Sequence, residues 1–92
     1  MSAGEPWRVD FDADAAKELR ALGGAERQQV LNYLRKRIAT PEDPRRFGKA
    51  LTGDLKGLWR YRVGDVRIIT SIQDQTVTVL VLRVANRRAV YD

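Results

Sequence analysis

GLWRYRVGDVR, residues Gly57 to Arg67, is the stretch that most restricts the fold. Gly64-Asp65 separates two alternating runs, as a two-residue hairpin loop does, and Gly at the first central position fits a type II′ turn. A turn of this kind sets the pairing of the two strands. The predicted pairs are Val63 with Val66, Arg62 with Arg67, Tyr61 with Ile68, and Arg60 with Ile69.

The predicted hairpin gathers three arginines, Arg60, Arg62 and Arg67, on one face, because side chains alternate along a strand. The apolar side chains on the other face are expected to pack on helices; they are Tyr61, Val63, Val66 and Ile68. Like charges directly opposite each other, as predicted for Arg62 and Arg67, destabilise a sheet. The nearby acidic residue, Asp65, lies in the turn and does not neutralise them. Arginine stems that cover apolar sheet surface would explain one such residue, whereas three on one face indicate a functional site.

Outward from the hairpin, hydrophobic periodicity predicts an edge-type strand and two helices before it and a central strand after it. Asp12 or Asp14 is expected to cap the first helix, and Gly23-Gly24 to end it. Because almost no residues separate the two helices, they are expected to form an antiparallel helical hairpin. The apolar stripes are Ala15, Leu19 and Leu22 in the first helix and Val30, Leu31, Leu34 and Ile38 in the second. The strands are predicted over residues 7–11, 58–63, 66–72 and about 76–84, and the second helix over about 25–39.

The segment from Thr40 to Gly57 contains several helix breakers and no sustained period. It is predicted to be a loop with one helical turn near Phe47–Leu51. The order is therefore β-α-α-β-β-β, within a single domain over residues 1–92. We expect an α+β fold in which a two-helix hairpin packs on one face of an antiparallel sheet and leaves the other face, wholly or partly, for function.

The composition excludes several classes of site. The 92 residues include no cysteine and no histidine, so a disulfide framework, a cysteine-based metal site and every Ser-His or Cys-His arrangement are excluded. We expect neither a metal ion nor another cofactor. No apolar run is long enough for a membrane span and no signal-peptide pattern is present, so we expect a cytoplasmic protein with no membrane partner.

The charge is unevenly distributed. The net charge is +5, and residues 1–44 hold seven basic and eight acidic side chains whereas residues 45–92 hold ten and four. A strongly basic half is typical of proteins with a polyanionic partner, such as nucleic acid, an acidic protein or a membrane surface. Charge alone does not separate these partners from a generally basic, soluble protein.

Three segments together resemble the RelE branch of the RelE/ParE toxins: FDADAAKELRAL, GKALTGDLKGLWRYRVGDVRII and VANRRAVYD. They follow the family's order, cover nearly the whole chain, and the last two are the specific ones. The resemblance implies a metal-independent endoribonuclease that enters the ribosomal A site, cleaves mRNA there and inhibits translation. It also implies a cognate RelB-like antitoxin and a toxin–antitoxin complex that binds operator DNA through the antitoxin.

The resemblance also implies which residues act. The catalytic set is Arg60, Arg62, Arg67, Arg87 and Tyr91. Arg62 and Arg67 are expected to bind the phosphate while the 2′-hydroxyl of the RNA attacks it; Arg60 and Arg87 lie near the leaving group, and Tyr91 relays a proton or stacks on a base. A second set is expected to bind ribosomal RNA: Arg45, Arg46, Lys49, Lys56 and Arg88, the last also being an alternative match for Arg87.

Departures from the family leave the proton transfers open. Asn86 replaces a histidine and Thr70 a tyrosine found in many relatives, and Arg60 and Arg62 replace lysines found in some. A guanidinium is effectively always charged, so these two arginines are poor general bases. The alternatives are a ParE-like toxin that acts on DNA gyrase and a non-catalytic RNA-binding module.

Overall fold

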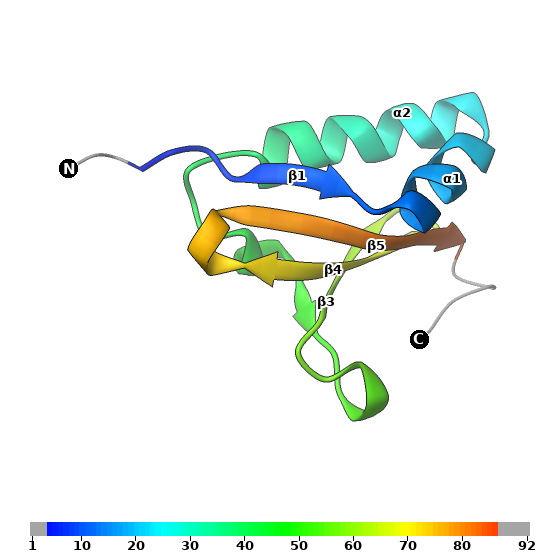
Figure 1. Ribbon diagram of the computed structural model, residues 1–92. Helices are drawn as coiled ribbons and strands as arrows, with labels where there is room; N and C mark the ends of the chain where they lie inside the picture. The colour runs from blue at the N-terminus through cyan, green and yellow to red at the C-terminus, as the bar shows by residue number, and fades with distance from the viewer. Residues whose placement is uncertain (1–3, 87–92) are drawn as a thin grey trace.

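A five-stranded sheet with the order β1-β5-β4-β3-β2 organises the chain, and two helices pack on one of its faces (Figure 1). The computed structural model describes residues 4–86. The helices are α1 (Ala13–Ala21) and α2 (Gly24–Tyr33), which continues as a π-helical turn over Leu34–Ile38. The strands are β1 (Arg8–Phe11), β2 (Lys49–Ala50), β3 (Trp59–Val63), β4 (Val66–Gln73) and β5 (Thr78–Asn86). The predicted α+β fold is confirmed.

The hairpin of β3 and β4 has the predicted register. Val63 pairs with Val66, Arg62 with Arg67, Tyr61 with Ile68, and Arg60 with Ile69. Gly64 has a φ of 59°, whereas Asp65 is not among the described residues with positive φ. A positive φ at the first central residue alone is what a type II′ turn requires. Because the turn fixes the register, it also decides which side chains of both strands face the helices.

The first strand is an edge strand, as predicted, but it runs parallel to its neighbour. Arg8 pairs with Thr78 and Phe11 with Val81, so β1 and β5 form a parallel pair in an otherwise antiparallel sheet. The expectation of a wholly antiparallel sheet was wrong at this strand. The reason is that β1 connects to the other strands through two helices, and a tight turn, which would force antiparallel pairing, is absent from that connection.

The segment between α2 and β3 is more ordered than its composition indicates. The predicted helical turn near Phe47–Leu51 is wrong, because the turn lies at Pro44–Phe47 and residues 49–50 form β2. Asp43 caps that turn by accepting a hydrogen bond from the backbone N–H of Arg45 at 3.0 Å. After β2, the chain makes a further 3₁₀ turn over Gly53–Leu55 in a loop that projects from the body of the protein (Figure 1).

The core lies between the helices and the sheet face that they cover. The buried residues of the predicted helical stripes are Ala15, Val30, Leu34 and Ile38; those of the predicted apolar face of the hairpin are Tyr61, Val66 and Ile68. Thr70 is buried as well, and its hydroxyl donates to the Trp59 carbonyl oxygen at 3.1 Å. Thr70, which stands where many members of the family that the chain resembles have tyrosine, therefore lies on the side of the sheet that the helices cover. Among residues 4–86, no helix has the length and apolarity needed to cross a bilayer.

Tyr61 ties the loop after α2 to the sheet. Its ring is fully buried, and its hydroxyl donates to the carbonyl oxygen of Pro44 at 2.7 Å. Burial raises the pKa of Tyr61, so the phenol stays protonated and able to donate. The ring of Tyr33 lies 6.1 Å from that of Tyr61, centroid to centroid, and completes the contact with α2. One side chain therefore joins three segments of the fold.

We expect Tyr61→Phe to lower the free energy of unfolding by about 1–2 kcal/mol, because it leaves the buried Pro44 carbonyl without its donor. Urea denaturation followed by circular dichroism measures this loss. Tyr33→Phe is the matched control, because no hydrogen bond of its hydroxyl is found among the described residues. Equal stability of Tyr61→Phe and the wild type would contradict the role of the hydrogen bond.

Candidate nucleic-acid interface

Four cations of β2, β3 and β4 lie on the sheet face opposite the helices, and we call them the basic face: Lys49, Arg60, Arg62 and Arg67. The register places them there, because directly opposed residues of antiparallel strands project from the same side of a sheet. Lys49 on β2 is opposite Arg60 on β3, and Arg62 on β3 is opposite Arg67 on β4. The predicted grouping of the three arginines is thus confirmed in position, and Lys49 joins it.

The members of the basic face differ in burial. Lys49 and Arg62 are exposed, Arg60 is half-buried, and Arg67 is only 5% exposed. Ile69 lies between Arg60 and Arg83 in the register and is 1% exposed, as expected where long arginine stems cover apolar sheet surface. Packing thus restricts Arg67 before any ligand arrives, which lowers the entropy lost on binding an anion.

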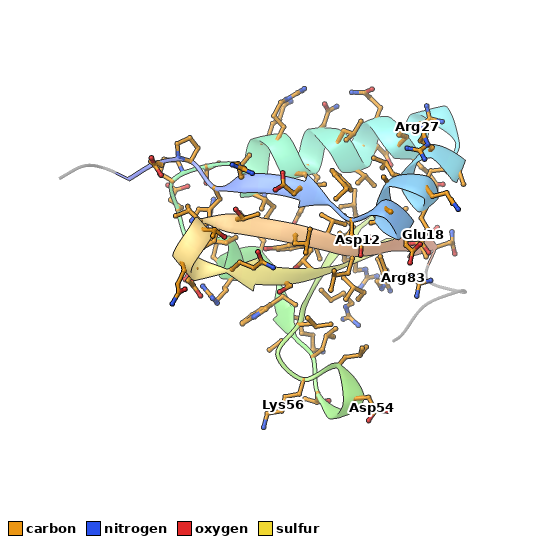
Figure 2. All side chains as sticks on the ribbon, in the orientation of Figure 1. Asp12, Glu18, Arg27, Asp54, Lys56 and Arg83 are labelled. Carbon is orange, nitrogen blue, oxygen red and sulfur yellow. The ribbon has the colours of Figure 1, made fainter. Side chains whose placement is uncertain are left out.

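Arg83 lies on the same side of the sheet, but a carboxylate of α1 binds it (Figure 2). The Nε of Arg83 donates to Glu18 Oε2 at 2.9 Å, and its Nη2 lies 2.8 Å from the same oxygen. The other oxygen of Glu18 accepts the backbone N–H of Val84 at 2.8 Å, beyond the point where β1 stops pairing with β5. Glu18 therefore neutralises one arginine and closes a free stretch of strand edge.

The protonation of Glu18 depends on these contacts. Burial opposes ionisation of the carboxyl, but the hydrogen bonds from Arg83 and Val84 and the charge of Arg83 outweigh it, so the pKa of Glu18 lies below its ordinary value. This pair was not predicted from the sequence, because its members are 65 residues apart. One signal was available: Arg83 is the single charged residue of a largely apolar central strand, where a charge needs a partner.

The second predicted set of cations does not form one cluster. Arg45 contacts Asp74 at 2.6 Å and Asp43 at 3.2 Å, and Arg46 contacts Glu42 at 3.0 Å. The hydrogen bond from Arg45 lowers the pKa of Asp74. These two arginines hold the loop after α2 in place.

The other members of the predicted sets lie elsewhere. Lys56 is exposed near the tip of the projecting loop (Figure 2), and Lys49 belongs to the basic face. Arg87, Arg88 and Tyr91 lie outside the described residues. Asn86, at the end of β5, pairs with Val66 at the same end of the sheet as the Gly64-Asp65 turn.

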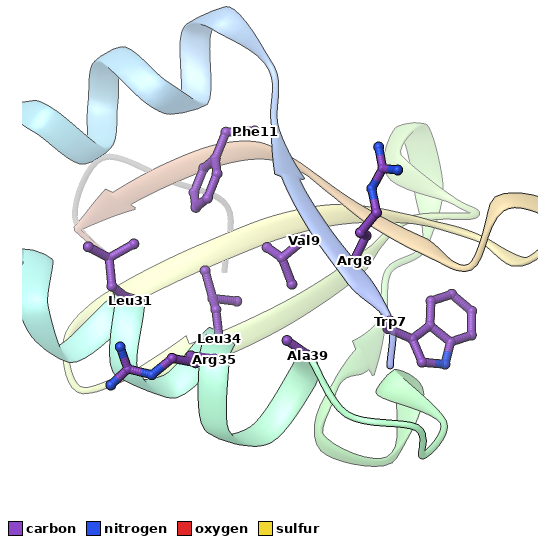
Figure 3. A pocket seen from close by; sticks show the side chains of 8 residues that line it. All are labelled: Trp7, Arg8, Val9, Phe11, Leu31, Leu34, Arg35 and Ala39. Atoms are coloured by element: carbon purple, nitrogen blue, oxygen red, sulfur yellow. The ribbon is translucent and has the colours of Figure 1, made fainter. Parts of the chain in front are cut away.

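A separate apolar groove runs between β1 and α2 (Figure 3). It encloses a cavity of about 370 Å³, lined by Trp7, Arg8, Val9, Phe11, Leu31, Leu34, Arg35 and Ala39. Two guanidiniums flank an otherwise apolar lining, so the groove suits an amphipathic segment with acidic residues. The outer edge of β1 borders the same groove and is the edge of the sheet.

Comparisons with known proteins agree on one family. A family model described as "ParE toxin of type II toxin-antitoxin system, parDE" matches residues 9–91. Toxin RelE of Mycobacterium tuberculosis is 32% identical over 91 residues, covering 99% of this chain and 92% of its own. Toxin RelG of the same organism is 30% identical over 86 residues, covering 94% and 97%.

Solved structures agree in fold. The toxin–antitoxin complex RelBE2 of Mycobacterium tuberculosis matches with a TM-score of 0.82 at 30% identity, over 90% of this chain and 93% of that one. The isolated RelE toxin of E. coli matches with a TM-score of 0.69 at 26% identity, over 87% and 83%. The chain therefore belongs to the RelE/ParE toxins of type II toxin–antitoxin systems, and its similar relatives are RelE-type toxins.

We expect Glu18→Gln to lower the free energy of unfolding at pH 7 by about 1 kcal/mol, because a neutral amide binds Arg83 and the Val84 N–H less strongly than a carboxylate does. The folded-state pKa lies below the ordinary value of 4.5, so this stabilisation is present above pH 4.5 and disappears as the pH falls through the folded-state pKa. Urea titrations across this range measure it. Glu5→Gln, at an exposed site, is the control; a Glu18→Gln protein as stable as wild type at pH 7 would rule the account out.

Proposed function

We propose that this toxin is a ribosome-dependent endoribonuclease, which cleaves mRNA in the ribosomal A site and thereby inhibits translation. The observation that carries the proposal is Arg62 directly opposite Arg67 on the face that the helices leave uncovered. Folding alone does not favour two like charges in that position, whereas an anion between them would stabilise both. The similarity to RelE toxins at about 30% identity supports an RNA substrate for this anion site.

The proposed reaction uses the RNA as its own nucleophile. The 2′-hydroxyl attacks the adjacent phosphate, the bond to the 5′-oxygen breaks, and a 2′,3′-cyclic phosphate and a 5′-hydroxyl result. Arg62 and Arg67 bind the non-bridging oxygens and stabilise the charge that develops on them; one such donor is worth about 3 kcal/mol. Arg67 is positioned by its burial, and Arg62 is exposed to approaching RNA.

The remaining predicted residues keep their proposed roles. Arg60 is adjacent to this pair on β3 and is proposed to act near the leaving group together with Arg87. Tyr91 is proposed to relay a proton or to stack on a base. The ribosome would hold the mRNA in the reactive geometry, which can supply a large part of the rate acceleration.

Docking on ribosomal RNA is proposed to involve Lys56 and Arg88. Lys56 is exposed on a projecting loop and forms no ion pair within residues 4–86, so it can approach phosphates freely. Arg45 and Arg46 contribute less direct charge, because each already contacts a carboxylate. Their proposed role is to present the loop that leads into β2.

A second candidate is a ParE-like toxin that acts on DNA gyrase, since the matching family model bears the ParE description. The basic face weighs against it, because the resemblance associates the basic set with the RNA-cleaving branch. The two candidates separate in one experiment: a gyrase toxin would arrest growth and leave mRNA intact.

The proposed partner is a RelB-like antitoxin in the cytoplasm, with the complex binding operator DNA through the antitoxin. Two features support it. The groove between β1 and α2 can take an amphipathic segment, and the edge of β1 can accept a further strand. The cations of the basic face and of the groove rim favour acidic residues in the antitoxin.

We expect Arg62→Ala to slow cleavage of ribosome-bound mRNA about 10²-fold, the rate equivalent of one lost donor to the transition state. Primer extension on programmed ribosomes measures the rate. Arg8→Ala is the matched control, since Arg8 lies at the far edge of the sheet and pairs with Asp10 at 3.2 Å. Unchanged cleavage by Arg62→Ala, or growth arrest by the wild type with intact mRNA, would overturn the nuclease proposal.

We expect the affinity for the antitoxin to fall as the salt concentration rises, because opposite charges across the interface are screened. Isothermal titration calorimetry from low to high sodium chloride measures the slope. Arg35→Ala, at the groove rim, should reduce that slope, whereas Lys17→Ala, exposed on α1, should not. An affinity independent of salt would contradict the charge component of the interface.

A further inference from the structure

Lys49 is held in place by the pairing of β2 with β3, which the sequence around Lys49 does not predict. It pairs with Arg60 and Ala50 pairs with Trp59, and the ladder continues where the Leu51 N–H donates to the Leu58 carbonyl oxygen at 3.0 Å. Gly48 lets β2 approach closely, since a Cβ there would lie 3.2 Å from the Tyr61 ring and 3.3 Å from the Trp59 ring. Lys49 is therefore positioned by its backbone pairing with Arg60 and by the packing of the preceding Gly48 on the buried Tyr61 ring.

The position of Lys49 brings its amine within reach of the proposed phosphate site. Directly opposed residues have Cβ atoms about 5 Å apart, and diagonal neighbours about 7–8 Å apart. Arg60 is the direct neighbour of Lys49 and Arg62 is a diagonal one. A lysine stem of four carbons spans such distances, so its ammonium can contact an RNA phosphodiester bound on the basic face.

Lys49 also differs from the cations just before it in the chain. Arg45 and Arg46 contact carboxylates, whereas within residues 4–86 the ammonium of Lys49 forms no ion pair. It is exposed on a strand that presents it beside Arg60. The charge of Lys49 is therefore available to a ligand, and its neighbours on the ladder are cations that attract the same ligand.

The chemistry of the basic face requires a group that can release a proton. Guanidinium groups stay protonated, so Arg60, Arg62 and Arg67 can bind the phosphate but transfer protons poorly. Lys49 is the member of the basic face that carries an amine instead of a guanidinium group. Arg60 and Arg62 stand where some relatives have lysines. The β2–β3 pairing places the amine of Lys49 beside Arg60.

We propose that Lys49 is a catalytic residue whose ammonium protonates the 5′-oxygen leaving group, an inference that rests on the proposed nuclease function. The bond from O2′ to phosphorus forms while the bond from phosphorus to O5′ breaks. The 2′-hydroxyl proton passes to solvent hydroxide, and one proton passes from the Lys49 Nζ to O5′, leaving a neutral amine that solvent reprotonates. Arg62 and Arg67 hold the non-bridging oxygens throughout.

The test compares two ribosome-bound mRNAs, one with the natural 5′-oxygen at the cleaved linkage and one with a bridging 5′-sulfur. A thiolate leaves without protonation because thiols are far more acidic than alcohols. Lys49→Met should slow cleavage of the oxygen substrate about 10²-fold or more in single turnover, the range of general-acid catalysis. The same variant should cleave the sulfur substrate at nearly the wild-type rate.

Two further variants make the outcome decisive. Lys49→Arg keeps the charge but not a readily released proton, so it should be slow on oxygen and normal on sulfur. Lys17→Ala controls for loss of a lysine outside the basic face and should match the wild type on both. Full activity of Lys49→Arg on oxygen, or equal losses on both substrates by Lys49→Met, would overturn the proton-donor role. A wild type that cleaves neither substrate would instead overturn the nuclease function, and the role of Lys49 with it.

Discussion

The positive φ of Gly64 is the constraint on which the rest of the structure depends. It allows a two-residue turn, and that turn sets the register of β3 and β4. A slip by one residue would move Tyr61 out of the core and Arg62 into it. The same register that buries Tyr61 against the helices therefore places Arg62 opposite Arg67 on the other face. Core and basic face are two results of one turn.

The cations of the chain divide into two kinds by their partners. Arg45 and Arg83 contact carboxylates of distant segments and tie a loop and a helix to the sheet, whereas Arg46 contacts Glu42 within its own loop. Lys49 and Arg62 are exposed and form no ion pair within residues 4–86. This division of the cations supports the proposed anion site on the basic face.

Local signals in the sequence predicted much of the fold and part of the site. The turn residues Gly64-Asp65 and the alternation around them determine the hairpin, so its register and the faces of its arginines followed. Pairings that bring distant segments together left no local pattern: the parallel β1–β5 pair, the short β2 opposite Arg60, and the contact of Glu18 with Arg83. The turn near Phe47 was placed too late in the chain, because Asp43 caps a turn that begins at Pro44 and residues 49–50 pair with the distant β3.

We propose that the hairpin register builds a site for the scissile phosphate of an mRNA. It is tested most directly by a structure of the toxin on a ribosome carrying mRNA with a 2′-deoxy nucleotide at the cleavage site, which blocks attack but keeps the phosphate. The account predicts non-bridging oxygens within hydrogen-bond distance, about 2.7–2.9 Å, of the guanidiniums of both Arg62 and Arg67. A phosphate bound on any other surface of the protein would contradict it.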